Sequence, residues 1–275
     1  MRVGKELDYL VREAKKSSIL PGTSTDNIHH CPPGEDFQRA ERHTVERASL
    51  ILPRNVCWDD ITVLASAIEA HEPSSYGHPR RVAHLAQAIG QALGWEKKRV
   101  ATIEIGALLH DLGKIAISDA ILKKPGPLTE EEFNEVKRHP EAGARLLAAG
   151  NLSIEAAIPY ALYHHERYDG RGYPYGLAGE DIPIEGRILA VADTFEALIS
   201  DRPYRKKMEP ELALEIIERS ASSQFDPNVV AAFLKAWEAG QIQILLETRR
   251  TEKQAPPLKL EDIVMGIPAE ELVTL

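Results

Sequence analysis

The feature that most constrains this chain is a helical spacing of apolar residues that runs almost unbroken from Trp58 to Ala239. Apolar residues recur at steps of three and four, which is the spacing of helices that bury one face. The segments are 58–70, 78–94, 97–113, 128–139, 153–165, 185–199, 210–221 and 226–240. Strand-like alternation is nearly absent before QIQILLE at 241–247. The pattern therefore predicts an all-α helical bundle.

Two of these helices carry recognisable start signals. Thr129 precedes Glu132 by three residues, which is the spacing of a capping box. The last helix opens with Asp-Pro at 226–227, an acceptor suited to the N-cap followed by a residue suited to the first turn. The helix over 128–139 is expected to close at His139, because Pro140 follows directly.

Composition changes on both sides of the helical region, which predicts three parts: an N-terminal helix and linker segment at 1–55, a helical domain at 56–240 and a C-terminal tail at 241–275. Residues 19–36 are rich in turn formers and typical of a linker, so His29 and His30 are expected to be linker residues. The tail could dock on the helical body or on a partner.

Charge and motifs exclude several functional classes. With 42 acidic against 33 basic residues, the chain lacks the basic face of a general nucleic-acid binder, although a local cationic patch could hold a small anion. It has no apolar stretch long enough to cross a bilayer and no secretory signal, so a cytoplasmic protein without membrane attachment is expected. Cys31 and Cys57 form no CxxC pair and are expected to be reduced. Walker, dinucleotide-binding and GxSxG motifs are absent.

Histidines and acids mark a candidate metal site. Five of the ten histidines lie in or beside the motif-bearing segments: His78, His110, His139, His164 and His165. Asp111 follows His110 directly, and Asp193 lies in an otherwise apolar stripe, where a carboxylate is costly unless it is paired or bound to metal. Imidazole and carboxylate together suit first-row metals, and an Asp can bridge two ions about 3.5–4 Å apart. The set can therefore supply the ligands of two ions.

A single histidine at a helix end is more often a cap or a surface residue than a ligand. His43, His71 and His84 receive that interpretation. Chance placement explains one such histidine more easily than it explains five histidines together with two acids.

Two long motifs resemble the HD-GYP family of bacterial phosphodiesterases, a branch of the HD metal-hydrolase superfamily. They are HDLGKIAISDAILKKPGPLTEEEFNEVKRHP at 110–140 and HHERYDGRGYPYGLAGEDIP at 164–183. The likeness covers about residues 58–239 and includes His110-Asp111 and Gly172-Tyr173-Pro174. It implies an all-α HD-domain bundle with an HD-GYP extension. It also implies a metal centre that hydrolyses cyclic di-GMP, a bacterial second messenger, to pGpG, with further cleavage to GMP left open.

The resemblance also implies a ligand set. Position by position, the metal ligands fall on His78, His110, Asp111, His139, His164, His165 and Asp193. The first ion would be held by His78, His110, Asp111 and Asp193, and the second by His139, His164 and His165, with Asp111 bridging. Two divalent transition-metal ions are expected, Fe or Mn before Ni, Co or Zn.

A third ion is not expected. Some members of the family carry a glutamate four residues before the first histidine and hold three ions. That position is Ser74 in this chain, and Glu69 and Glu72 lie nearby but out of register.

The same resemblance suggests how the reaction runs. A water between two ions would lose a proton, and the bridging hydroxide would attack phosphorus and expel the ribose 3′ oxygen. Asp111 would be the catalytic bridge, and Lys114 would bind the phosphate or protonate the leaving oxygen, unless it only counters a helix dipole. Arg202 and Arg205 match phosphate-contacting positions, or form a solvated basic cluster with the two lysines that follow. Tyr173 could stack on a guanine, bond a phosphate or be structural.

Two other functions stay open. An HD phosphohydrolase acting on another cyclic dinucleotide, such as cyclic GMP-AMP, or on a nucleotide would use the same metals. A catalytically weak signalling scaffold would act by protein contact instead. The expected partners are cyclic di-GMP and either a second copy of the chain or a signalling protein, with no nucleic acid and no membrane.

Overall fold

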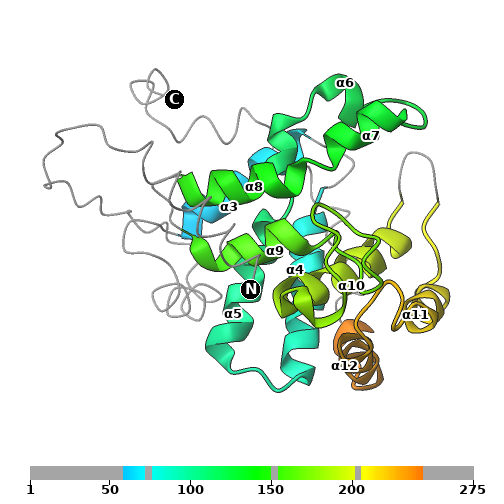
Figure 1. The fold of residues 1–275 in the computed structure, drawn as a ribbon. Helices are drawn as coiled ribbons and strands as arrows, with labels where there is room; N and C mark the ends of the chain where they lie inside the picture. The colour runs from blue at the N-terminus through cyan, green and yellow to red at the C-terminus, as the bar shows by residue number, and fades with distance from the viewer. Residues whose placement is uncertain (1–57, 72–75, 150–153, 202–205, 244–275) are drawn as a thin grey trace, which may run out of the picture.

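The computed structural model describes residues 58–71, 76–149, 154–201 and 206–243, and in these ranges the regular elements are helices. Two isolated β-bridges, Asp169–Ala178 and Ala221–Phe225, are the extended pairings among the described residues. The all-α prediction is therefore confirmed for this part of the chain (Figure 1). The elements are α3 (Trp58–His71), α4 (His78–Ala92), α5 (Lys97–Leu109), η2 (Leu112–Ala116), α6 (Asp119–Leu122), α7 (Glu130–Val136), α8 (His139–Ala149), η3 (Glu155–Ala157), α9 (Ile158–Tyr163), η4 (Gly179–Asp181), α10 (Ile184–Ile199), α11 (Pro210–Arg219) and α12 (Pro227–Glu238).

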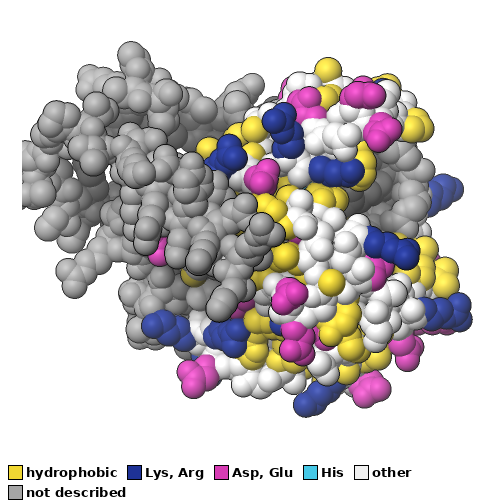
Figure 2. All heavy atoms as spheres, in the orientation of Figure 1, with side chains coloured by type: hydrophobic (Ala, Val, Ile, Leu, Met, Phe, Trp, Pro, Cys, Tyr) yellow, Lys and Arg dark blue, Asp and Glu magenta, His cyan; other side chains and the backbone are white. Residues whose placement is uncertain are grey.

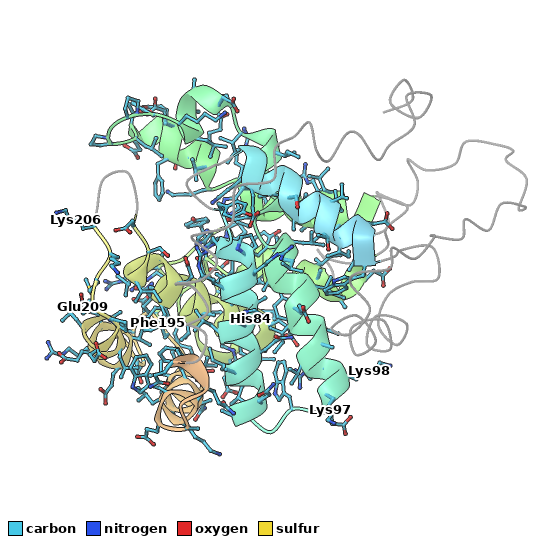
Figure 3. All side chains as sticks on the ribbon, turned by 180° about the vertical axis from the view of Figure 1, so that it is seen from behind. His84, Lys97, Lys98, Phe195, Lys206 and Glu209 are labelled. Carbon is cyan, nitrogen blue, oxygen red and sulfur yellow. The ribbon has the colours of Figure 1, made fainter. Side chains whose placement is uncertain are left out.

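The apolar side chains form two clusters. The first lies among α4, α10, α11 and α12, where Phe195 (Figure 3) packs edge-to-face on Phe233 with ring centroids 4.9 Å apart. The second lies among α3, α5, α8 and α9. Helix α5 belongs to both, because Ile103 is buried in the first cluster and Ile105 in the second. The residues that follow α5 are thereby held between the two cores.

The predicted start signals are confirmed. The Thr129 side chain accepts from the backbone N–H of Glu132, and the Glu132 carboxylate accepts from the backbone N–H of Thr129, as a capping box requires. Asp226 accepts from the backbone N–H of Asn228 at 2.7 Å, and Pro227 is the first residue of α12.

Two helix boundaries differ from the prediction around the HD motif. Helix α5 ends at Leu109 rather than near Gly113, and the 3₁₀ helix η2 follows a turn. A Cβ at Gly113 would lie 1.9 Å from the backbone oxygen of His139, so η2 packs on the start of α8 more closely than any other residue allows. His139 does not close α7, which ends at Val136; it is the first residue of α8. Pro140 then falls in the first turn, where its missing N–H costs nothing.

The strand-like alternation at 241–247 does not form a strand in its first residues. Residues 241–243 are helical, and Ile242 is fully buried in the first apolar cluster. A strand at this point would need a pairing edge, and the described residues offer no strand to supply one. Residues 244–247 lie outside the described ranges.

Several sequence predictions fall on residues that the structure does not describe. The N-terminal segment 1–55, most of the tail 241–275, and His29, His30 and His43 are among them, so the three-part division stays a prediction. No described helix combines the length and the apolar character needed to span a bilayer. On the face shown in Figure 2, acidic, basic and apolar side chains are intermixed over the described residues.

Candidate metal centre

The seven predicted ligands converge between the two apolar clusters. They come from the start of α4, the turn after α5, the start of α8, the turn after α9 and the middle of α10. Five of them are buried: His78, His110, Asp111, His139 and His164. His165 and Asp193 are partly buried, the Asp193 side chain being 19% exposed.

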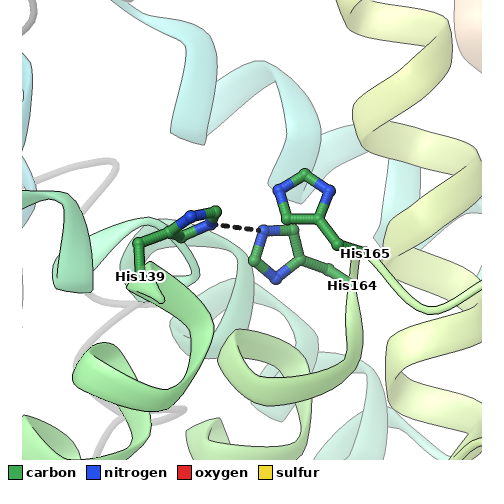
Figure 4. Close-up of side chains that lie close together, drawn as sticks. All are labelled: His139, His164 and His165. Atoms are coloured by element: carbon green, nitrogen blue, oxygen red, sulfur yellow. Dashed lines mark hydrogen bonds between the residues drawn. The ribbon is translucent and has the colours of Figure 1, made fainter. Parts of the chain in front are cut away.

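Three imidazoles form one group, which we call the histidine triad: His139, His164 and His165. One ligand atom from each lies within 4.8 Å of the others. Figure 4 shows the His139 and His164 rings pointing at each other, with their Nε2 atoms 3.3 Å apart. The His164 and His165 rings lie 4.0 Å apart, centroid to centroid.

A second group, the mixed triad, consists of His78, His110 and Asp111, again with ligand atoms within 4.8 Å of one another. The His110 Nε2 lies 3.3 Å from Asp111 Oδ2. Asp193 adjoins this group, because its Oδ1 lies 3.2 Å from His78 Nε2.

The Asp111 carboxylate lies between the two triads. Its Oδ1 is 3.4 Å from His139 Nε2 and 3.9 Å from His164 Nε2, whereas its Oδ2 faces His110. Lys114 approaches the same Oδ2 at 2.8 Å, with a side chain that is 18% exposed. One carboxylate thus contacts both groups while a cationic side chain borders it.

The tautomers of three histidines are fixed by backbone acceptors. Each donates its Nδ1–H to the carbonyl oxygen three residues earlier, in the pairs His110–Ala107 at 2.6 Å, His139–Val136 at 2.7 Å and His164–Ala161 at 2.9 Å. A proton on Nδ1 leaves the Nε2 lone pair directed at the centre. The Nε2 of His110 is buried and has no hydrogen-bond partner among the described residues. A buried acceptor without a donor is costly, and a cation would satisfy it, so this donor set fits a transition-metal ion.

The pKa values of the histidine triad favour the binding of a cation. Burial lowers the pKa of His139, and burial together with the neighbouring imidazoles holds the pKa of His164 well below its usual range. Burial and His139 lower the pKa of His165 to about 3. The three rings are therefore neutral at pH 7, which is the form that binds metal.

His78 behaves in the opposite way. Burial alone would lower its pKa, but hydrogen bonds to Asp193 and Glu196 outweigh burial and raise the pKa to about 9. Burial likewise opposes ionisation of Asp111, yet the Lys114 ammonium holds the pKa of that carboxyl well below its usual range. The mixed triad thus combines a protonated imidazole with an ionised carboxylate.

Glu196 is a site residue that the sequence reasoning missed. It is 1% exposed, and its Oε2 accepts from His78 Nδ1 at 2.6 Å. Its Oε1 accepts from Arg81 Nε at 2.6 Å and from the Ser200 hydroxyl at 2.5 Å. The signal was its position three residues after Asp193, which puts both acids on one face of an apolar helix.

Glu166 is a second missed residue, and it organises the loop after the histidine pair. It is 3% exposed and accepts from the backbone N–H groups of Tyr175 at 2.7 Å and Leu177 at 3.1 Å. The signal was an acid placed directly between His165 and a glycine-rich loop.

The loop after the histidine pair, which contains Gly172 and Tyr173, folds back onto His165. A Cβ at Gly172 would lie 2.4 Å from the backbone nitrogen of Arg167, so glycine permits the tight return. The Tyr173 N–H donates to the His165 carbonyl at 3.2 Å, and the two rings stack with centroids 4.7 Å apart and planes at 28°. Tyr173 therefore contacts the histidine triad directly.

The remaining predicted site residues are only partly described. Arg202 and Arg205 lie outside the described residues, as do Ser74 and Glu72, so their roles stay predictions. Glu69 is described, and its Oε1 accepts from the backbone N–H of Gly77 at 2.9 Å. His84 is exposed on α4 (Figure 3), in keeping with its interpretation as a surface residue.

Comparison with known proteins adds a family and several relatives. A model described as HD domain matches residues 62–229. Over 178 residues the chain is 46% identical to the cyclic di-GMP phosphodiesterase response regulator RpfG of Xanthomonas campestris pv. campestris, an alignment that covers 64% of this chain and 47% of the relative. It is 43% identical over 176 residues to a cyclic di-GMP phosphodiesterase of Thermotoga maritima, covering 64% and 48% of the two chains.

A further relative has a different named substrate. The 3′3′-cGAMP-specific phosphodiesterase 2 of Vibrio cholerae is 36% identical over 176 residues, which cover 64% of this chain and 34% of the relative. The chain spans less than half the length of each of these three relatives.

Proposed function

The chain belongs to the HD domain family, as its motifs predicted, and we propose that it is a metal-dependent phosphodiesterase that hydrolyses cyclic di-GMP to pGpG, with GMP as a further product. The observation that carries this proposal is the position of Asp111, whose two oxygens face different groups of imidazoles. Hydrolases that use two metals hold them about 3.5–4 Å apart, a spacing that one carboxylate can bridge. The names of the Xanthomonas and Thermotoga relatives support cyclic di-GMP as the substrate.

We assign the ligands as the motifs suggest. His78, His110, Asp111 and Asp193 would hold one divalent ion, and the histidine triad with Asp111 would hold the other. Imidazole and carboxylate donors suit Fe or Mn, and Ni, Co or Zn take the same ligand types. When bound, two such cations lower the pKa of a water between them and withdraw charge from a phosphate oxygen.

The chain's own side chains orient the reactants around these positions. Lys114 Nζ lies 2.8 Å from Asp111 Oδ2, next to the residues that would hold the ions. From there the Lys114 ammonium would contact the phosphate and supply a proton to the leaving 3′ oxygen. Arg202 and Arg205 are assigned to the phosphates, because their forked donors match phosphate oxygens. The cytoplasmic location expected from the sequence is part of the same proposal.

Metal analysis and an activity assay on one preparation test the proposal. The full chain, purified without oxygen, is expected to contain two transition-metal ions and to convert cyclic di-GMP to pGpG in a chromatographic assay. Fully loaded protein that leaves cyclic di-GMP intact would contradict the activity. Three ions per chain would contradict the two-ion assignment but leave the activity standing.

A second candidate is hydrolysis of 3′3′-cGAMP, which the similarity to the Vibrio cholerae enzyme favours. The same ligands would serve, and only the contacts to one base would differ. Parallel assays at equal concentrations decide between the two: a higher kcat/KM for 3′3′-cGAMP would replace cyclic di-GMP in the proposal. Loaded protein that cleaves neither compound would instead support the signalling scaffold.

A further inference from the structure

Helices α6 and α7 form a projection that contributes no described buried residue to either apolar cluster. Figure 1 shows them at one end of the molecule, beyond α8. The projection is nevertheless braced from within, by the Thr129–Glu132 capping box and by an ion pair of 2.6 Å between Lys124 Nζ and Glu132 Oε2. Because α6 and α7 are held together locally but bury no described residue in either apolar cluster, we looked for a role for them at the neighbouring site.

Phe133 of α7 connects this projection to the candidate metal centre. Its ring meets Tyr173 edge-to-face, with centroids 6.3 Å apart and planes at 81°. Tyr173 in turn stacks on His165, a member of the histidine triad. Three aromatic rings therefore run in series from the triad to α7, and the outermost, Phe133, is still 43% exposed.

Packing on the helix surface explains only part of this arrangement. A single exposed apolar side chain is common and needs no explanation. Lys137 Nζ lies 4.6 Å from the Phe133 ring centroid, which an ordinary cation–π pair one helical turn apart would produce. Neither point accounts for the contact with Tyr173, which places an open aromatic surface beside the site.

We propose that Phe133 is a base-stacking residue that holds a purine of the substrate while its phosphate lies at the histidine triad. The inference rests on the proposed function. It gives a substrate-binding role to a residue of the first motif that is not one of the proposed metal ligands. Every base has a π-face that an aromatic side chain can stack on, whatever the base identity. The Lys137 ammonium lies over one face of the ring, 4.6 Å from its centroid, so the purine is placed on the other face.

Four substitutions in the full, metal-loaded chain test the proposal. Phe133→Ala removes the ring, Phe133→Leu keeps apolar bulk without a π-face, and Phe133→Trp keeps the π-face. Leu212→Ala on α11 is the matched control, because that side chain is 49% exposed. Three quantities are measured for each: the Kd for GMP by calorimetry, and the KM and kcat for cyclic di-GMP. Hydrolysis of methyl 4-nitrophenyl phosphate, which has no nucleobase, reports on the metal centre alone.

The expected result is a rise of about 10- to 100-fold in Kd and KM for Phe133→Ala and Phe133→Leu, the size that loss of one stacked base gives. Phe133→Trp and Leu212→Ala stay near the parent values, and methyl 4-nitrophenyl phosphate is cleaved at the parent rate throughout. Unchanged GMP affinity in Phe133→Ala overturns the inference, as does full affinity in Phe133→Leu. A lower melting temperature in Phe133→Ala but not in Leu212→Ala also overturns it, in favour of a packing role.

The two proposals fail in different ways. If the parent protein does not cleave cyclic di-GMP, the proposed function is contradicted, and GMP binding still tests Phe133. If the parent protein cleaves cyclic di-GMP and the Phe133 variants bind and cleave it equally well, only the stacking role is lost.

Discussion

His139 and His164 in the histidine triad are oriented by backbone carbonyls three residues away, whereas His78 in the mixed triad is oriented by Glu196, a carboxylate 118 positions away in the chain. The first kind of orientation forms as soon as the local helix end forms. The second requires α4 and α10 to be docked, which depends on the first apolar cluster. The site therefore combines imidazoles oriented by local geometry, His110 of the mixed triad among them, with one, His78, that is oriented by tertiary packing.

The two triads also differ in how a proton competes with a cation. The imidazoles of the histidine triad have lowered pKa values and are neutral at pH 7. His78 has a pKa raised to about 9, and its Nε2 lies 3.2 Å from Asp193 Oδ1. With that pKa, His78 keeps a proton at pH 7, and a cation bound there would have to displace it. The histidine triad should accordingly accept a cation first when the pH is neutral.

Asp111→Ala tests whether the triads share a ligand and should have the largest effect. Removing the carboxylate that faces both groups is expected to lower metal content below one ion per chain. Turnover should fall by at least about 10³-fold, because losing a single transition-state donor already costs about 10²–10³-fold. Metal analysis and the cyclic di-GMP assay measure both effects.

The matched control for this change is Asp119→Ala, which removes an exposed acid of α6 that pairs with Lys123. It should leave metal content and turnover at the parent values. A full ion retained by Asp111→Ala, with normal turnover, would show that the two triads do not share that carboxylate.

Glu196→Gln tests whether the mixed triad depends on its distant support. The substitution keeps the shape of the side chain but removes the charge that holds His78. Loss of such a supporting carboxylate typically weakens metal binding by about 10- to 100-fold. The binding step assigned to the mixed triad, which is expected to be the weaker of the two, should show this loss. Competition with a chelator measures the two steps separately.

Glu185→Gln on the same helix provides the comparison, because Glu185 pairs with Arg99 at 3.1 Å. It should change neither binding step. Equal weakening of both steps by Glu196→Gln would break the distinction between local and distant support.

The pH dependence of metal uptake should separate the triads further. Below a pH of about 9, metal binding at the mixed triad must release the proton of His78. The affinity of the mixed triad for metal should therefore fall about tenfold for each unit by which the pH is lowered. Binding at the histidine triad should stay nearly constant between pH 7 and 9, because its imidazoles carry no proton to release. Titration with chelator-buffered Zn²⁺ from pH 7 to 9 distinguishes the two slopes, and parallel slopes would contradict the difference.

The same proton contributes to the stability of the metal-free protein. The pKa of His78 is raised from 6.5 to about 9 on folding, so its contribution is fully present below pH 6.5 and is lost as the pH rises through about 9. The urea midpoint of metal-free protein should therefore fall across this range. In His78→Gln the fall should be smaller, and an identical fall would assign it to other groups.

The features that depend on residues close in the sequence are also the ones that the sequence predicts well. Apolar spacing located most of the helices, although not α8, and Thr129, Glu132 and Asp226 marked two helix starts correctly, because each signal acts within one turn. The seven side chains proposed as ligands could be brought together on paper for a related reason: most of them lie in two uninterrupted motifs.

Features that depend on contacts between distant segments were harder to predict. Glu196 looks like any acid of an amphipathic helix until α4 brings His78 to it. The end of α5 was misplaced and helix α8 was not predicted, and both lie where two backbone segments meet, with Gly113 packed against His139. Periodicity reports which face of a helix is buried, but not which other segment reaches that face.

Gly113→Ala tests that backbone contact and should have the smallest effect on metal binding, because it removes no ligand atom. An added Cβ would lie 1.9 Å from the His139 oxygen and must push η2 away from α8. Overpacking of this kind costs about 1–3 kcal/mol, which urea unfolding of the metal-free protein can measure. Gly126→Ala is the control, since no atom lies within 4 Å of a Cβ there. Because the displacement separates Asp111 from His139, the binding step assigned to the histidine triad should weaken more than the other. Unequal weakening would show that the locally oriented triad still depends on one tertiary contact, the contact that gives it access to the shared carboxylate.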